Sequence, residues 1–271
     1  MPTSRGDRDV LTRHARPADL HIQYAEHEDG LVDVWLPPDD SAPAPLVLVL
    51  HGGFWRAAFD RTHLGPMCEA LAARGFAAAA PEYRRVGGAG GWPTTFDDIA
   101  RAVEQVPSEI AGLAGNRVRR APAVLVGHSA GGHLALWAVS HRRSPATAAG
   151  VVALAPVADI VAARRAGLGN GAVDELLAEL PSDQHKLVDP VRLLPAGTPT
   201  VLVHGTADDR VPVSQSRDYR SAAVHAGDDC RLAELDGVGH FALIDPGATA
   251  FDVVVEAITR LVPPSGNQPN S

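Results

Sequence analysis

Lysine, cysteine and long hydrophobic segments are nearly absent from this chain of 271 residues. Lys186 is the only lysine, and acidic residues outnumber Lys plus Arg by 32 to 24, which gives a formal net charge of −8. An acidic chain without a basic cluster is poorly suited to neutralising phosphates, so we expect no nucleic-acid partner. The two cysteines, Cys68 and Cys230, stand far apart in no metal or redox spacing and are predicted to be buried thiols.

No membrane segment or secretion signal is evident. No apolar run approaches the roughly 18–20 residues of a membrane span, and residues 1–20 lack the apolar core of a signal peptide. We therefore expect a cytoplasmic protein with no membrane partner. The histidines show no metal-ligand spacing supported by carboxylates, so no metal is expected either. The sequence leaves the oligomeric state open.

Apolar residues make up 45% of the chain, which is ample for a large core, and their pattern predicts an α/β fold. A hairpin is expected first, from His21–Glu26 and Leu31–Leu36 around a turn at Glu28-Asp29-Gly30. Short apolar strands then alternate with helices, which is typical of a doubly wound, mostly parallel sheet. The predicted strands are Leu46–Leu50, Phe76–Ala80, Ala123–Val126, Val151–Ala155, Thr200–His204 and Arg231–Leu235. The predicted helices are His63–Arg74, Phe96–Val106 (resuming beyond Pro107 to Leu113), Ala130–His141, an irregular stretch Val157–Leu180, Ser214–Ala226 and Thr249–Leu261.

One domain accounts for this pattern. Residues 1–18 read as a loose polar arm or one with a short helix, 19–262 as the domain and 263–271 as a disordered polar tail. The segment at about 156–195 is longer than a simple crossover requires. It is expected to form a small helical cap.

The most specific motif is Gly127-His128-Ser129-Ala130-Gly131, directly after an apolar strand and directly before a helix-forming stretch. This is the G-x-S-x-G nucleophile elbow in its strand–turn–helix context. A serine hydroxyl must be presented at the top of a sharp turn to attack a carbonyl, and the two glycines relieve the crowding of that turn. Ser129 is therefore the predicted nucleophile.

Two further segments supply the groups that would activate this serine. Asp208 follows a predicted strand, and His240 follows the last one, so both fall at the carboxyl edge where open α/β sheets place ligands. His240 would accept the Ser129 proton, and Asp208 would fix the imidazole tautomer. Asp209, Asp236 and Asp159 are further candidates for the acid.

The loop after the first parallel strand reads His51-Gly52-Gly53-Phe54-Trp55. Backbone N–H groups from Gly52, Gly53 and Phe54, together with that of Ala130, are predicted to form the oxyanion hole. His51 is expected to hydrogen-bond backbone in this loop. Trp55, Trp92 and His128 are candidate substrate-binding residues, although the two tryptophans could equally be packing residues of the loop layer.

These motifs resemble those of the α/β-hydrolase superfamily of serine esterases and acylhydrolases over roughly residues 20–262. The oxyanion segment 51–55, the elbow 127–131 continued by Gly132-His133-Leu134-Ala135, the acid segment 204–208 with Val211-Pro212, and Gly239-His240 carry the likeness. The first two are similar to arylformamidase and feruloyl-esterase-like branches. The acid segment resembles feruloyl-esterase-like and prolyl-oligopeptidase-like hydrolases.

The resemblance implies a cofactor-independent hydrolase that cleaves carboxylic esters of small to medium soluble molecules through an acyl-serine intermediate. Arylformamidase or small-peptide hydrolysis is the alternative within the enzymes, and an acyltransferase shares the same intermediate. A non-catalytic ligand-binding protein on the same fold is the alternative outside them.

Overall fold

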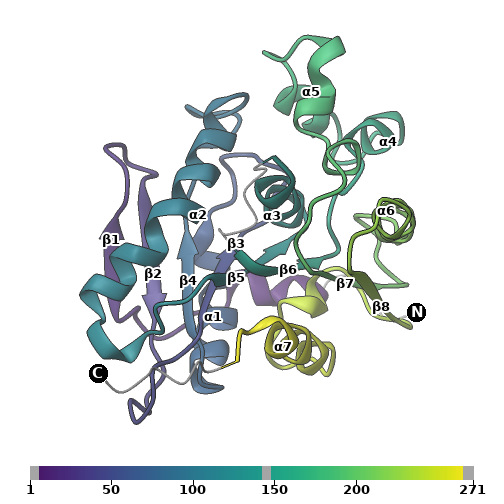
Figure 1. Cartoon of the computed structure of the whole chain (residues 1–271). Coiled ribbons are helices and arrows are strands. Elements are labelled where there is room, and N and C mark those ends of the chain that lie inside the picture. The colour runs from purple at the N-terminus through teal and green to yellow at the C-terminus, as the bar shows by residue number, and fades with distance from the viewer. Residues whose placement is uncertain (1–5, 142–147, 265–271) are drawn as a thin grey trace.

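The computed structural model describes residues 6–141 and 148–264, and these fold around one eight-stranded sheet (Figure 1). The strand order is β1-β2-β4-β3-β5-β6-β7-β8. The pairs β1–β2 and β2–β4 are antiparallel, and all the other pairs are parallel. The strands are β1 Leu20–Gln23, β2 Leu31–Trp35, β3 Leu46–Leu50, β4 Ala77–Pro81, β5 Ala123–His128, β6 Ala148–Leu154, β7 Thr200–Gly205 and β8 Cys230–Leu235. The predicted α/β-hydrolase architecture with an antiparallel N-terminal hairpin is confirmed.

Helices cover both faces of the sheet, which explains the apolar character of its central strands. Every residue of β3, β4, β5 and β7 is buried. Helices α2, α3 and α6 pack on one face, and α1 and α7 pack on the other (Figure 1). The α-helices are α1 Gly65–Ala73, α2 Thr94–Leu113, α3 Ala130–His141, α4 Ile160–Arg165, α5 Ala172–Leu176, α6 Ser214–His225 and α7 Ala250–Leu261.

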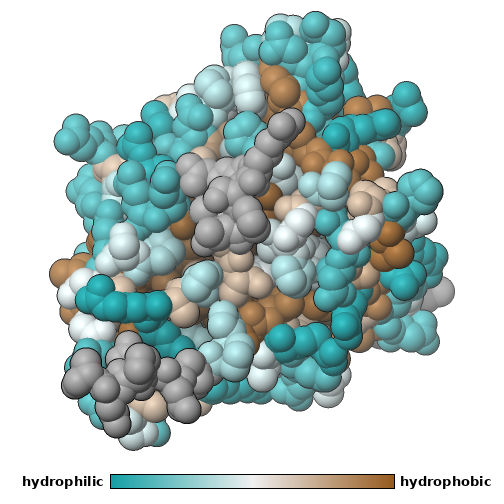
Figure 2. All heavy atoms as spheres, in the orientation of Figure 1, coloured by the Kyte–Doolittle hydropathy of each residue, from teal (hydrophilic) through white to brown (hydrophobic). Residues whose placement is uncertain are grey.

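Helix α2 shows how side-chain pattern selects the buried face. It runs without a break through Pro107, where the sequence predicted an interruption. Phe96, Ile99, Val103 and Val106 recur at helical spacing on its buried side. Its outer side is hydrophilic in Figure 2, as is that of α5.

The segment predicted as a cap consists of short helices. The two α-helices α4 and α5 project beyond the end of α3 (Figure 1), and the chain returns through two 3-10 helices, η4 Ser182–Leu187 and η5 Pro190–Arg192. Asp159 caps the start of α4 by accepting the Ala162 N–H at 2.7 Å. Many glycines in this stretch keep its helices short, in agreement with the irregular helix predicted there.

The N-terminal segment is packed against the domain, not loose. Its 3-10 helix η1, Gly6–Thr12, buries Val10 in the same apolar cluster as Leu243. Arg13 binds Asp245 through two contacts of 2.6 and 3.0 Å. A single buried valine and one bidentate ion pair are weak signals in a polar sequence, so the expectation of a free arm is wrong for residues 8–18. Most of the predicted tail, 265–271, lies outside the described residues.

Strand register brings the chemistry-bearing loops together. Leu50 pairs with Gly127, which sets the loop after β3 beside the turn after β5. Gly205 pairs with Leu235, which sets the loop after β7 beside the loop after β8. All four loops leave the carboxyl edge of the parallel strands, where this fold class places its ligands.

Candidate active site

Ser129 stands at a strained turn between β5 and α3. Its φ of +57° is unusual for a residue with a Cβ. The turn is held by the Ser129 N–H, which donates to Leu154 O at 2.8 Å, and by its carbonyl, which accepts the His133 N–H at 3.1 Å. Strain of this kind persists only where surrounding contacts fix it. The sharp turn that the motif predicted is present.

The two elbow glycines are required because neighbouring backbone lies too close to leave room for a Cβ. A Cβ on Gly127 would collide with the backbone of Gly131, and a Cβ on Gly131 would collide with the carbonyls of Leu50 and His51. Gly52 lies equally close, since its Cβ would stand 2.9 Å from His128 O and 3.1 Å from the Ser129 Cβ. The loop after β3 therefore touches the serine turn directly.

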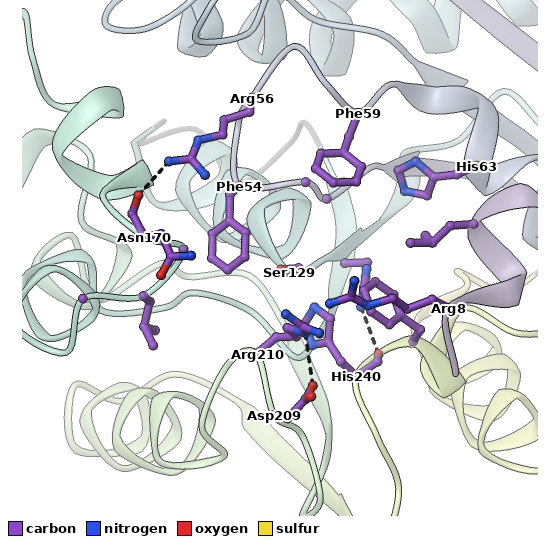
Figure 3. A pocket seen from close by; sticks show the side chains of 18 residues that line it. Arg8, Phe54, Arg56, Phe59, His63, Ser129, Asn170, Asp209, Arg210 and His240 are labelled. Carbon is purple, nitrogen blue, oxygen red and sulfur yellow. Dashed lines mark hydrogen bonds and ion pairs between the residues drawn. The ribbon is translucent and has the colours of Figure 1, made fainter. Parts of the chain in front are cut away.

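His240 and Asp208 form a close pair. The His240 Nδ1–H donates to Asp208 Oδ2 at 2.6 Å, and both side chains are almost fully buried. Asp208 is fixed in turn by the N–H groups of Arg210 and Val211, which both donate to Oδ1 at 2.8 Å. Because Nδ1 donates to the carboxylate, His240 Nε2 is the nitrogen left to accept a proton. Ser129 and His240 line the same cavity (Figure 3).

The surroundings of Asp208 keep it ionised. Burial alone would raise its pKa, but hydrogen bonds from His204 and His240, the charge of His240 and the Val211 N–H outweigh burial and hold the pKa far below its usual range. His204 Nε2 lies 3.4 Å from Asp208 Oδ2 and donates to Val211 O at 2.9 Å. The carboxylate is thus an acceptor at any pH at which the protein would work.

The other predicted acids are engaged elsewhere. Asp209 is more than half exposed and lies 3.2 Å from Arg210 Nε. Asp236 accepts the Thr206 hydroxyl at 3.1 Å, and Asp159 caps α4. None of them makes a hydrogen bond to His240 within the described part of the chain.

His128 holds the backbone of His240 in place. Its Nε2–H donates to the His240 carbonyl at 3.1 Å, and the two rings lie 4.4 Å apart. Burial, and then the charge of His240, holds the pKa of His128 well below its ordinary value, so the ring is neutral. His128 lines the cavity, as expected of a substrate-binding candidate, but its hydrogen bond marks it mainly as a support for the His240 backbone.

The loop after β3 turns sharply beside Ser129. Gly53, Phe54 and Trp55 all have positive φ, of 110°, 51° and 58°. Three such residues in a row turn successive peptides toward one side, which is the geometry of an anion-binding nest. Within residues 6–141 and 148–264, no backbone carbonyl accepts the N–H of Gly53 or Phe54, and Ala130 starts α3, where N–H groups lack intrahelical partners. These donors remain available to a ligand.

A second histidine–carboxylate pair lies beneath this loop. His51 Nδ1 contacts Gly52 O at 2.7 Å, and Nε2 contacts Glu82 Oε1 at 2.7 Å. The two ring nitrogens of His51 are thus held at both ends, one by the carbonyl of Gly52 and the other by the carboxylate of Glu82. The bond to Gly52 O fixes the Gly52–Gly53 peptide, as expected of a His51 that bonds loop backbone, and so directs the Gly53 N–H. Burial raises the Glu82 pKa, but His51, Arg61 N–H and Arg85 outweigh it and lower the pKa overall.

The two tryptophans predicted to bind substrate do not line the cavity. Trp55 is fully buried, and its indole N–H donates to His133 Nδ1 at 3.1 Å. Trp92 packs edge-on against Phe96 with ring centroids 5.3 Å apart. Both are packing residues of the loop layer, which is the alternative that the sequence left open, and the substrate-binding alternative is not supported for them. His133 in turn donates through Nε2 to Val188 O at 2.7 Å, which connects the Trp55 side chain to the base of the cap.

The cavity encloses about 430 Å³. Phe54, Phe59 and Leu168 contribute apolar surface, and the turn 167–170 between α4 and α5 forms one wall. His63 lines it from the other side, with burial lowering its pKa to about 4. The size and mixed lining suit a small or medium organic molecule. No cluster of His, Cys, Asp or Glu that could hold a metal occurs in the residues described.

Sequence reasoning missed the side chains that hold the site together. His204 stands four residues before Asp208, and Glu82 follows β4 at the same sheet edge as His51. Their position after adjacent strands was a usable signal. Arg8 was not predicted at all, because its place at the cavity depends on the packing of η1.

Comparison with known proteins gives a family for this arrangement. The BD-FAE family model matches residues 32–222. The chain belongs to the BD-FAE family. The match contains the β3 loop, Ser129 and Asp208, whereas His240 lies beyond its end.

Individual relatives are more distant. Kynurenine formamidase of Salmo salar is 31% identical over 121 residues, 45% of this chain and 38% of that protein. Esterase LipQ of Mycobacterium tuberculosis is 28% identical over 255 residues, 86% of this chain and 57% of LipQ. The chain thus spans only part of the length of these relatives.

A solved structure confirms the fold. The truncated carbohydrate esterase from gut microbiota has a TM-score of 0.76 at 19% identity and covers 90% of this BD-FAE chain and 98% of its own. No helix among the described residues is both long enough and apolar enough to cross a membrane.

Proposed function

We propose that this protein is a serine hydrolase that cleaves carboxylic esters of small to medium soluble molecules without a cofactor. The observation that carries the proposal is the 2.6 Å His240–Asp208 pair in the same cavity as the strained Ser129. The BD-FAE family match and the esterase relative LipQ support it. The cytoplasmic location stays a prediction from the sequence.

The residues have complementary parts in the proposed reaction. Ser129 Oγ attacks the ester carbonyl carbon, and its proton passes to His240 Nε2. The carbonyl π electrons move to oxygen, and N–H groups of the loop Gly52–Phe54 and of Ala130 stabilise that oxyanion, each typically by about 2.7–4 kcal/mol. Asp208 stabilises the imidazolium without accepting its proton.

The intermediate then collapses. The oxyanion reforms the carbonyl, the bond to the alcohol oxygen breaks, and His240 donates its proton to that oxygen. A water molecule attacks the acyl-Ser129 ester by the same steps, with His240 again taking a proton, and the acid leaves. The neutral His128 and the ionised Asp208 keep His240 in place throughout.

Formamide hydrolysis is the second candidate. The kynurenine formamidase match favours it over peptide hydrolysis and acyl transfer, but that match covers only 45% of the chain. Small-peptide hydrolysis uses the same steps with an amine leaving group. A binding protein without catalysis is disfavoured, because Ser129, His240 and the oxyanion donors are all present at one cavity.

Hydrolysis of p-nitrophenyl acetate and butyrate, run beside N-formylkynurenine, tests the proposal. Wild-type protein should hydrolyse the esters, and Ser129→Ala, which removes only one oxygen, should abolish turnover with its circular dichroism unchanged. Equal activity of the Ser129→Ala protein would overturn the proposal. A much higher kcat/KM for N-formylkynurenine than for either ester would select formamide hydrolysis instead.

A further inference from the structure

The cavity is cationic although the chain is acidic. Three arginines line the cavity, namely Arg8, Arg56 and Arg210. The lining contains one carboxylate, that of Asp209. The whole chain carries a formal charge of −8. A cavity opposite in sign to the rest of a protein concentrates ligands of the complementary charge.

The three arginines differ in how far they are neutralised. Arg56 is fully engaged, because Glu175 accepts two hydrogen bonds from it at 2.7 and 2.8 Å and Asn170 O accepts a third at 2.9 Å. Arg210 has its Nε 3.2 Å from Asp209 Oδ1, but that Nε makes no hydrogen bond within the described residues. Arg8 is exposed and has no ion-pair partner among the described residues.

Both under-neutralised arginines lie on the His240 side of Ser129. Arg210 belongs to the turn of Asp208, which accepts its backbone N–H. Arg8 belongs to η1, which packs against the 3-10 helix η6, Phe241–Leu243, directly after His240. In Figure 3, Arg8 and Arg210 lie beside His240, whereas Phe54, Arg56 and Asn170 lie on the opposite side of Ser129.

The contacts of η1 fix Arg8 beside the segment that carries His240. Val10 is 1% exposed and shares an apolar cluster with Leu243. Arg13, just after η1, holds Asp245, just after η6, through a bidentate ion pair. Leu11 of η1 also lines the cavity. The segment that carries Arg8 is thereby anchored to the segment that carries His240.

Which part of a substrate meets these arginines follows from the proposed reaction, on which this inference rests. His240 must deliver its proton to the leaving oxygen, so the alcohol part of the ester lies on the His240 side. We infer that the alcohol part of the substrate carries an anionic group, such as a carboxylate, which Arg8 and Arg210 bind. Planar guanidinium groups suit that task because each can donate two parallel hydrogen bonds to a carboxylate.

A matched pair of esters tests this inference. 4-Acetoxybenzoate and 4-acetoxybenzamide share the acyl group and the ring and differ in one negative charge on the alcohol part. The readout is the ratio of their kcat/KM values, each divided by the rate of its hydroxide-catalysed hydrolysis to remove the difference in leaving-group reactivity. One hydrogen-bonded charge contact is typically worth about 1.5–3 kcal/mol, so the wild-type ratio should favour the benzoate by roughly 10-fold or more.

The variants are Arg8→Gln, Arg210→Gln and the double variant, with Arg231→Gln as the control. Arg231 is exposed near the start of β8, at the ends of the strands opposite to the cavity. Its substitution therefore changes the net charge equally but leaves the cavity intact. The ratio should fall toward one in the double variant, fall partly in the single variants and persist in the control. High salt should lower the wild-type ratio by screening.

Three results would overturn the inference. The first is a wild-type ratio near one, and the second is a ratio that the double variant does not change. The third is an Arg8- and Arg210-dependent preference for mono-4-nitrophenyl succinate over 4-nitrophenyl butyrate, which would place the anion on the acyl side. In each case, hydrolysis of neutral 4-acetoxybenzamide by wild type but not by Ser129→Ala keeps the proposed function. Failure to cleave any of these esters contradicts both.

Discussion

Two histidine–carboxylate pairs lie within this site, and their geometries are nearly the same. His240 meets Asp208 at 2.6 Å, and His51 meets Glu82 at 2.7 Å, with all four side chains almost completely buried. The two histidines differ in what their second ring nitrogen, the one not bound by the carboxylate, contacts. His240 keeps Nε2 for the cavity, whereas His51 uses Nδ1 on the carbonyl of Gly52.

The comparison shows that a histidine–carboxylate pair does not by itself make a proton-transfer site. The fate of the second ring nitrogen decides the role. A ring nitrogen left without a protein partner in the cavity that Ser129 also lines can exchange a proton, whereas one that binds a peptide carbonyl can only position the neighbouring peptide. We therefore expect the two pairs to respond differently to mutation, although each loses one buried contact.

The largest effect is expected at His240 itself. His240→Ala removes the base that we propose takes the Ser129 proton, and it should lower kcat on p-nitrophenyl butyrate by about 10⁴-fold or more. The measurement is steady-state kinetics on protein with a native circular dichroism spectrum. His51→Ala should cost far less in kcat, and a loss at His51 equal to that at His240 would break the distinction between the pairs.

The carboxylate of the first pair should come next. Asp208→Asn leaves the size of the side chain unchanged but favours the wrong imidazole tautomer, and it should lower kcat by about 10³–10⁴-fold. Asp209→Asn is the matched control, because Asp209 is exposed and contacts Arg210 instead of His240. Its kcat on a neutral ester should stay within about twofold. The reverse ranking of these two variants would assign the acid to Asp209.

The second pair should give a smaller, positional effect. Glu82→Gln removes the charge that holds His51 and loosens the Gly52–Gly53 peptide. We expect kcat to fall by about 10–100-fold with little change in KM, less than the roughly 10²–10³-fold cost of losing an oxyanion donor outright. Asp98→Asn is the control, because Asp98 is a buried carboxylate that Arg84 binds and that does not line the cavity.

Both of these variants should lower the melting temperature, since each breaks a buried ion pair. Only Glu82→Gln should lower kcat. An equal fall in kcat for both variants, or a fall in Glu82→Gln that appears only in KM, would show that the His51 pair has a purely structural part.

A third buried carboxylate, that of Asp189, has no histidine partner, and its substitution should change the stability of the protein and leave kcat the least affected. Burial raises the pKa of Asp189 to about 6, and its Oδ2 has no hydrogen-bond partner among the described residues. Asp159 also raises the pKa, while the Ile160 N–H and Arg192, 4.0 Å away, oppose the rise. A folded pKa above the ordinary 3.8 means that the ionised form destabilises the fold, by roughly 3 kcal/mol above pH 6.

That cost should disappear as the pH falls from about 6 to about 4, because the folded state takes up the proton first. Asp189→Asn should therefore exceed wild type in free energy of unfolding at pH 8, and the two should converge near pH 3.5, below the ordinary pKa of 3.8. Urea denaturation at both pH values checks this. A gap between the two proteins that is independent of pH would contradict the raised pKa.

Local pattern was enough to predict the sheet and the candidate reactive groups. The run Leu46–Leu50 is apolar on both faces, and only a strand covered by helices on both sides satisfies that. Ser129 and Asp208 each follow such a strand, and His240 follows the edge strand β8, so sheet geometry alone brings their loops together. The antiparallel hairpin was equally local, since a turn signal separates its two strands.

The parts that were missed depend on contacts between distant segments. Trp55 looked like a pocket residue because its loop lines the cavity, but its positive φ turns the ring toward His133 on α3. Arg8 reaches the cavity only because Val10 and Arg13 anchor η1 near Leu243 and Asp245. No pattern within residues 1–18 specifies those partners.

The central claim is that Ser129 is a nucleophile activated by the His240–Asp208 pair. Reaction with the organophosphate paraoxon, followed by peptide mass spectrometry, tests it most directly. The account predicts one phosphorylated serine, Ser129, whose labelling is lost in Ser129→Ala, strongly slowed in Asp208→Asn and little changed in Asp209→Asn. A folded wild-type protein that stays unlabelled, or a label carried by another residue, would contradict it.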